Sequence, residues 1–333
     1  MTAKDKLLKL LSKGLSSSSA QTVALSIEKL LTNEVGLTST RLAELTKGFY
    51  EYFEADPQLM EQLSEEQREC IRTRSIPTIY NPHISLYLLE LGLALTKLDL
   101  ANSDPSAHPR QPHFYYLSTT DYVQHKYLPT DAEALRFYRY IDRVLSQFHE
   151  LGLNIGITAD HGMNSKVNYD GQPKVIYIEE ELKKGGFTGR VILPITDPYV
   201  KHHSSLGGYA TVYLDDKSPE SQLRAMIHLR QVYGIYTVLN REEACKAFDL
   251  PSDRIGDIVI FGDVSTVLGK SQSYHDLGEV HNLRSHGGID ESTVPIIFNR
   301  RLTTEYERRL TTGKGRNYQI LEFMFNGMKQ PQQ

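Results

Sequence analysis

A buried strand that runs directly into a carboxylate and an imidazole is the feature that most constrains this chain. In "LNIGITADHGMN", residues 153–164, apolar side chains at Leu153, Ile155 and Ile157 are followed at once by Asp160 and His161. Buried strands avoid charge unless it is paired or bound to a metal. In open α/β sheets, ligands bind beyond the carboxyl ends of the strands. The stretch therefore predicts a strand that ends at a binding site.

Hydrophobic spacing in the first half of the chain predicts mostly helices. We expect helices over residues 5–13, 22–32, 40–53, 82–98 and 131–152, and strands over 113–120 and 154–160. A strand, a long helix and a second strand form a βαβ unit, which implies a parallel pair. The predicted fold is therefore α/β, with a mostly parallel sheet sandwiched by helices.

From about residue 190 the pattern changes to short strands and helices in compact alternation. Strands are expected over 191–197, 209–216 and 234–240, with helices over 219–232 and 241–248. The main sheet resumes with strands over 256–263 and 294–299, and a closing helix follows over 317–328. We therefore predict a core over 1–184, a small α+β cap lobe over 185–250, and the core resumed over 251–333.

Composition excludes several classes of partner. The 37 basic and 41 acidic residues give a net charge of −4, which offers no electrostatic case for nucleic acid or an anionic membrane. No apolar run approaches the roughly 18 residues of a membrane span. The start, "MTAKDKLLKLLSKGL", has lysines where a signal peptide needs an apolar stretch. Two cysteines, Cys70 and Cys245, are too few for a disulfide framework, so we expect a reducing, cytoplasmic location.

A second pairing of aspartate with histidine occurs in "TTDYVQHK", residues 119–126. If Asp121 begins a helical turn, His125 lies one turn later, and side chains four apart share a helix face. Such a pair either lies on the surface without further role or holds a divalent cation. Because Asp160 and His161 follow within one predicted βαβ unit, we favour the cation.

The third candidate is His286, in the glycine-flanked turn of "LRSHGGIDESTVPIIFN". Gly287 and Gly288 allow backbone conformations that other residues resist, as where a main chain approaches a ligand closely. A lone turn histidine is usually polar surface. Together with the two Asp/His pairs, however, it completes a mixed set of nitrogen and oxygen ligands that zinc accepts. Five ligands suit two metals better than one, and a two-metal site is typical of phosphoryl or related ester transfer.

Several stretches resemble the alkaline phosphatase superfamily and, within it, the phosphonoacetate hydrolases. They are "LSTTDYVQHK", "TADHGMNSK", "DPYVKHHSSLGGYATVYL", "DRIGDIVIFGD", "LRSHGG" and the amino-terminal "MTAKDKLLKLLSKGL". The order and spacing of these stretches also match. The resemblance implies an alkaline phosphatase-like fold and a two-zinc hydrolase that cleaves the carbon–phosphorus bond of phosphonoacetate to give acetate and phosphate.

The resemblance also implies roles for individual residues. Asp121, His125 and His286 would bind one zinc, and Asp160 and His161 the second. Lys4 and Lys6 would contact the anionic substrate, although the residues alone favour a solvated helix start.

Two further pairs stand beside this ligand set. Thr158 and Asn164 are candidates for supporting the second zinc site by hydrogen bonds. His202 and His203 are loop residues that we do not assign to metal.

One departure concerns the nucleophile. Family members begin with a strand that carries a metal-binding aspartate, followed by a threonine nucleophile, and this sequence opens at the segment that comes next. We therefore assign no catalytic residue, and expect one well-ligated zinc and little phosphate release unless the family's amino-terminal segment is supplied.

Three functions stay open. The first is phosphonoacetate hydrolysis, with a small phosphonate as partner. The second is another branch of the superfamily that acts on phosphodiesters, nucleotides or phosphosugars. The third is a non-catalytic zinc-binding protein. A homodimer is left open as the assembly.

Overall fold

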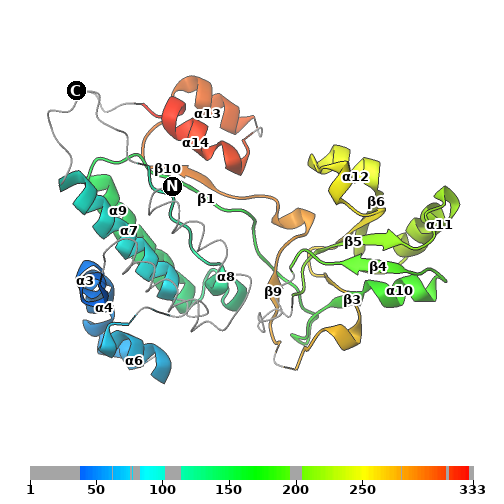
Figure 1. Ribbon diagram of the computed structural model, residues 1–333, viewed down its shortest axis with the longest axis horizontal. Helices are drawn as coiled ribbons and strands as arrows, with labels where there is room; N and C mark the ends of the chain where they lie inside the picture. The colour runs from blue at the N-terminus through cyan, green and yellow to red at the C-terminus, as the bar shows by residue number, and fades with distance from the viewer. Residues whose placement is uncertain are drawn as a thin grey trace. The chain divides into compact units, whose positions relative to one another are not determined.

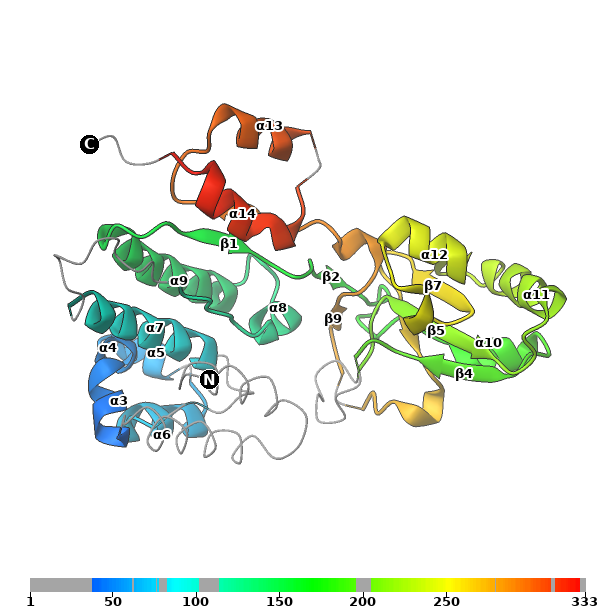
Figure 2. The ribbon, with the colours of Figure 1, turned by 45° about the horizontal axis from the view of Figure 1, so that its top comes forward.

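The computed structural model describes residues 38–61, 63–75, 77, 83–101, 114–195, 205–278, 280–312 and 315–329. It divides into two compact units, of which the first comprises Met1–Val123 and Tyr127–Ile155 and the second Gln124–Lys126 and Gly156–Gln333. Figures 1 and 2 show the elements of both. The helices predicted over 5–13 and 22–32 lie outside the described residues, as do Lys4, Lys6, His202 and His203.

The described part of the first unit is built from helices. They are α3 (Ser39–Leu45), α4 (Lys47–Glu54), α5 (Pro57–Glu61), α6 (Glu65–Thr73), α7 (His83–Ala101) and α9 (Ala132–Glu150). The helix predicted over 40–53 is divided at Thr46, whose hydroxyl donates to the Leu42 carbonyl oxygen at 2.7 Å. Helices α7 and α9 run side by side, and Tyr140 and Val144 of α9 are fully buried in their common core.

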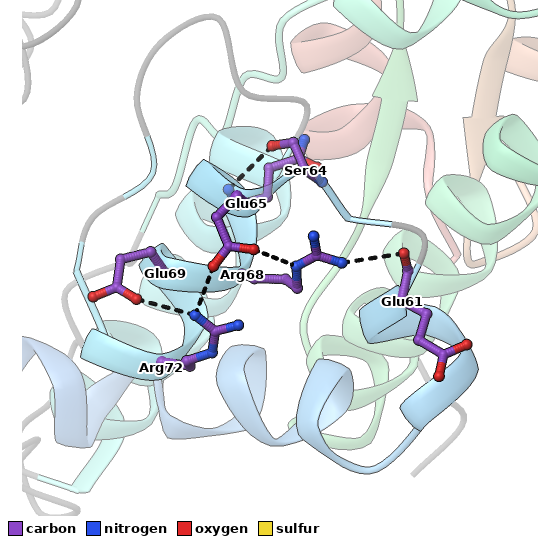
Figure 3. Close-up of polar contacts among 7 residues, drawn as sticks. Glu61, Ser64, Glu65, Arg68, Glu69 and Arg72 are labelled. Atoms are coloured by element: carbon purple, nitrogen blue, oxygen red, sulfur yellow. Dashed lines mark hydrogen bonds and ion pairs between the residues drawn. The ribbon is translucent and has the colours of Figure 1, made fainter.

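Helix α6 shows how local chemistry sets a helix start (Figure 3). The Ser64 hydroxyl accepts from the Gln67 amide at 3.2 Å, and the Gln67 side chain accepts from the Ser64 amide at 2.9 Å, so two amides of the first turn are satisfied. On the exposed face, Arg72 and then Arg68 lower the pKa of the Glu65 carboxyl by hydrogen bonding. Because these charges are solvated, they contribute little to stability.

The second unit contains a four-stranded sheet in the order β4 (Gly189–Ile192), β5 (Tyr209–Leu214), β7 (Ile258–Gly262), β6 (Ile235–Asn240), with antiparallel neighbours throughout. In β7, Ile258 and Ile260 pack in one cluster with α10 (Ile178–Lys184) and α11 (Pro219–Arg230). Val259 and Phe261 point to the other face, where α12 (Arg241–Phe248) packs. Helices therefore cover both faces of this sheet.

The remaining strands of the second unit form three short pairs. β1 (Gly156–Thr158) is antiparallel to β10 (Ile296–Phe298), and β2 (Asn164–Ser165) is antiparallel to β9 (Arg284–Ser285). β3 (Val175–Tyr177) is parallel to β8 (Val267–Gly269). The short helices of this unit include η1 (Ser252–Arg254), η2 (Gln272–Tyr274) and η3 (Ile289–Glu291). Helix α8 (Tyr122–Lys126) begins in the first unit, and its last three residues belong to the second.

The chain closes with helical turns near β1 and β10. α13 (Thr304–Thr311) is followed by a continuous helical stretch made of η4 (Asn317–Gln319), α14 (Ile320–Glu322) and the π-helical η5 (Phe323–Gly327). The closing helix predicted over 317–328 is thus confirmed. Phe323 is fully buried and stacks on Phe298 of β10, with ring centroids 6.0 Å apart.

Strand pairing differs from the sequence-based prediction. No strand occurs in residues 114–120, and β1 pairs antiparallel with β10, so the predicted βαβ unit is wrong. The Thr120 amide donates to the Ser85 hydroxyl at 2.9 Å, a side-chain partner in place of a neighbouring strand. Mixed helices and sheets confirm the α/β class, but among the described strands the only parallel pair is β3 with β8.

The predicted cap segment falls entirely within the second unit. Its strands β4, β5 and β6 share a sheet with β7, which comes from the segment predicted to resume the core. The boundaries of the cap lobe at residues 184 and 250 stay a prediction. Among the described residues, no helix has both the length and the apolar character that crossing a bilayer requires.

Candidate metal centre

Helix α8 carries the first Asp/His pair in the predicted arrangement. Asp121 is the residue immediately before the helix, and His125 follows one turn later. The His125 side chain is buried, and its Nδ1 lies 2.7 Å from the carbonyl oxygen of Arg284. Because Nδ1 must donate to that carbonyl, Nε2 is left with the lone pair that a metal needs.

Arg284 connects α8 to the loop that carries His286. Its backbone carbonyl fixes the ring of His125, while its own Nε donates to the Gln124 carbonyl oxygen at 2.8 Å. Arg284 is buried and is the first residue of β9. His286 follows two residues later, just after the strand ends. No role could be predicted for this arginine from "LRSHGG", because nothing local shows that it faces α8.

The loop after β9 and the residues before β5 that pack on it require glycine for different reasons. Gly287 has a φ of +95°, a conformation that other residues rarely adopt. The Gly208 amide donates to the His286 carbonyl oxygen at 2.7 Å, and a Cβ added at Gly208 would lie 2.6 Å from the Gly288 nitrogen. This close packing of backbone against backbone fixes the position of the His286 main chain, and so the direction of its side chain.

Asp121, His125 and His286 come together as a set of three metal-binding side chains. One ligand atom from each lies within 4.8 Å of the other two. Two imidazoles and one carboxylate are donors that zinc accepts, and three protein ligands leave a fourth position open to substrate, as in catalytic zinc sites. The donor chemistry and the spacing therefore fit a divalent metal such as zinc.

Asp160 and His161 lie beside this set. Asp160 follows β1, and its Oδ2 is 3.6 Å from His161 Nε2. His161 Nδ1 is 3.0 Å from the Gly162 carbonyl oxygen, so the Nε2 side of the ring faces the aspartate. The ring stacks on His286 with centroids 3.5 Å apart and an interplanar angle of 7°. In the described part of the chain, no third histidine, cysteine or carboxylate completes a group with this pair.

The two polar residues expected to support the second pair differ in their contacts. The Asn164 side-chain amide donates to Glu291 at 2.6 Å. The Thr158 hydroxyl donates to the neighbouring Ala159 carbonyl oxygen at 3.5 Å. Glu291 was missed at the sequence level, where an acidic residue in "GGIDES" looks like ordinary turn composition.

Solved structures that resemble this chain include two of a phosphonoacetate hydrolase. One is the phosphonoacetate hydrolase from Sinorhizobium meliloti 1021 in complex with phosphonoacetate, with 44% identity and a TM-score of 0.60 over 70% of this chain and 54% of that chain. The same enzyme in complex with phosphonoformate gives 43% identity and a TM-score of 0.59, with the same coverage. The chain thus spans about half the length of these solved relatives.

The sequence also matches a family profile. Residues 76–289, more than half of the chain, match the family described as type I phosphodiesterase / nucleotide pyrophosphatase. That range contains Asp121, His125, Asp160, His161 and His286. The chain therefore belongs to the type I phosphodiesterase / nucleotide pyrophosphatase family of the alkaline phosphatase superfamily.

Proposed function

We propose that this chain carries the metal centre of a zinc-dependent phosphonoacetate hydrolase, which cleaves the carbon–phosphorus bond to give acetate and phosphate. The observation that carries the proposal is the convergence of Asp121, His125 and His286 in a chain that is 44% identical to a phosphonoacetate hydrolase over 70% of its length. In this proposal these three residues bind the first zinc. Asp160 and His161 contribute to the second.

The protein's own groups prepare the site for such a reaction. The Arg284 carbonyl orients His125, and the packed glycines orient His286, so both imidazoles are fixed before a ligand arrives. Zinc bound there would supply a Lewis acid for the oxygens of the phosphonate. A site that is oriented in advance spends less binding energy on ordering itself.

Lys4 and Lys6 are proposed to contact the two anionic ends of the substrate. Phosphonoacetate carries a phosphonate and a carboxylate, and lysine provides a compact cationic charge for each. The proposal for these lysines rests on the resemblance of "MTAKDK" to the family.

A binding experiment tests the recognition step without relying on turnover. Calorimetric titration of phosphonoacetate into the zinc-loaded chain should show binding that is lost when zinc is removed. His286→Ala should lose it too, whereas His281→Ala, an exposed histidine five residues away, should keep it. Zinc-independent binding of equal strength in all samples would contradict the proposal.

Substrate choice separates the open functions. Phosphate release should be measured from phosphonoacetate, and release of the alcohol should be measured from a phosphodiester, because hydrolysis of a diester leaves a monoester instead of free phosphate. Both assays should use the chain alone and the chain extended by the amino-terminal segment of the Sinorhizobium meliloti enzyme. We expect release from phosphonoacetate by the extended form. Preferential cleavage of the diester would favour the phosphodiesterase branch, which the family description supports. Zinc binding without hydrolysis of either compound would favour a non-catalytic zinc protein.

A further inference from the structure

A fully buried ion pair lies next to the candidate metal centre, and the proposed ligand sets do not include it. Lys166 Nζ lies 2.9 Å from Glu291 Oε1, and the two side chains are 0% and 1% exposed. Lys166 also donates to the Val264 carbonyl oxygen at 2.9 Å. Burying two charges carries a large desolvation cost, and apolar residues of similar size often give equal stability. A role in positioning neighbouring groups would explain why charges are used here.

Glu291 contacts the Asp160–Asn164 loop at two points. Its carboxylate Oε1 accepts from the Asn164 side-chain amide at 2.6 Å, and its backbone carbonyl accepts from the Gly162 amide at 2.7 Å. A Cβ added at Gly162 would lie 3.3 Å from that carbonyl oxygen, which is tight. Glu291 therefore holds the loop that carries Asp160 and His161.

The other carboxylate oxygen of Glu291 contacts the loop that carries His286. Its Oε2 accepts from the Gly288 amide at 2.8 Å. A Cβ added at Gly288 would lie 2.8 Å from the same oxygen, so a side chain there would displace the carboxylate. One residue thus connects the two loops whose histidines, His161 and His286, stack on each other.

We propose that Glu291 is a positioning residue that sets the spacing between the two metal-binding loops, and that Lys166 fixes the carboxylate in place. This inference rests on the proposed metal centre. Each carboxylate oxygen serves a different loop, so the ligand pair Asp160/His161 and the ligand His286 are held relative to each other by one rigid group. Partners that orient metal ligands typically change metal affinity by about 10- to 100-fold when they are removed.

Three variants test the proposal, and they differ in how strongly each is expected to destabilise the fold. Glu291→Gln keeps the shape but has only one accepting oxygen, so it can satisfy one loop and not both, and it leaves the Lys166 ammonium unpaired. Lys166→Met combined with Glu291→Gln removes both charges together and avoids that penalty. Asn164→Ala removes one contact to the carboxylate and leaves the ion pair intact.

Asp257→Asn is the matched control. Asp257 forms an ion pair with Arg241 at 2.7 Å in the same unit, and its carboxylate also accepts from the Leu214 amide. The substitution is the same change from carboxylate to amide, made at the residue before β7. It should lower stability without altering the metal centre.

The experiment measures zinc affinity by competition with a chromophoric chelator, together with the visible absorption spectrum after cobalt replaces zinc. We expect the double variant, which loosens the His286 loop, to bind the tightly held zinc about 10- to 100-fold more weakly and to change the cobalt spectrum. Asn164→Ala acts on the Asp160/His161 loop and should weaken binding of the second zinc by a similar factor. Asp257→Asn should match the wild type in both. Unchanged affinity and spectrum in the double variant and in Asn164→Ala would overturn the positioning role, even if their melting temperatures fall. A wild-type chain that binds no zinc would instead refute the metal centre itself.

Discussion

Replacing His286 by alanine should abolish most of the stabilisation that zinc gives to the second unit, which holds the two histidine ligands His125 and His286. His286 supplies one of the three ligand atoms that lie within 4.8 Å of each other, so the variant keeps only Asp121 and His125. Two protein ligands fall short of the three that catalytic zinc sites use. Zinc should then bind too weakly to favour the folded state at moderate concentrations.

The size of the effect follows from linkage. A ligand present at 100 times its dissociation constant stabilises the folded state by about 2.7 kcal/mol. For a unit of roughly 180 residues, each kcal/mol corresponds to about 2–4 °C in melting temperature. The wild-type chain should therefore melt about 5–11 °C higher with saturating zinc than with a chelator.

Differential scanning calorimetry, run once with zinc and once with a chelator, measures this zinc-dependent rise in melting temperature. The substitution also removes the stacking of His286 on His161, but that loss affects both samples equally and cancels in the difference. His281→Ala controls for deleting an exposed imidazole from the same region. If His286→Ala keeps the full zinc-dependent rise in melting temperature, His286 is not a ligand and the proposed set is wrong.

Three other predictions follow. Elemental analysis of dialysed protein should find nearer one zinc than two, because Asp160 and His161 offer only two ligand side chains; two equally tight sites would show a missing ligand. Burial lowers the pKa of His83 to about 4, so the folded state should lose stability as the pH falls from about 6.5 to about 4. His83→Phe should weaken that dependence in urea titrations at both pH values, and an identical dependence would contradict it. Lys4→Ala should raise the phosphonoacetate concentration needed for half-saturation without releasing zinc; metal loss in this variant would exclude a substrate-contacting role.

Local features of this protein could be predicted from residues that are close in the sequence. Side chains four apart in a helix share a face, so "DYVQH" was sufficient to place Asp121 and His125 together at α8. The apolar run before Asp160 likewise predicted a strand that ends at the site, and β1 ends at Thr158. Amphipathic spacing predicted α9, and α7 and α11 were also predicted as helices from local sequence, because helix hydrogen bonds join residues only four apart.

The meeting of distant segments could not be predicted and is known from the folded structure. Strand direction depends on a partner elsewhere in the chain, and β1 found β10, some 140 residues later, in the antiparallel sense. Lys166 and Glu291 are 125 residues apart, and nothing near either one indicates a buried ion pair. Arg284 and His125 are separated by 159 residues. The ligands could be predicted because their chemistry is local, whereas the groups that orient them could not, because each is defined by contact with a remote part of the chain.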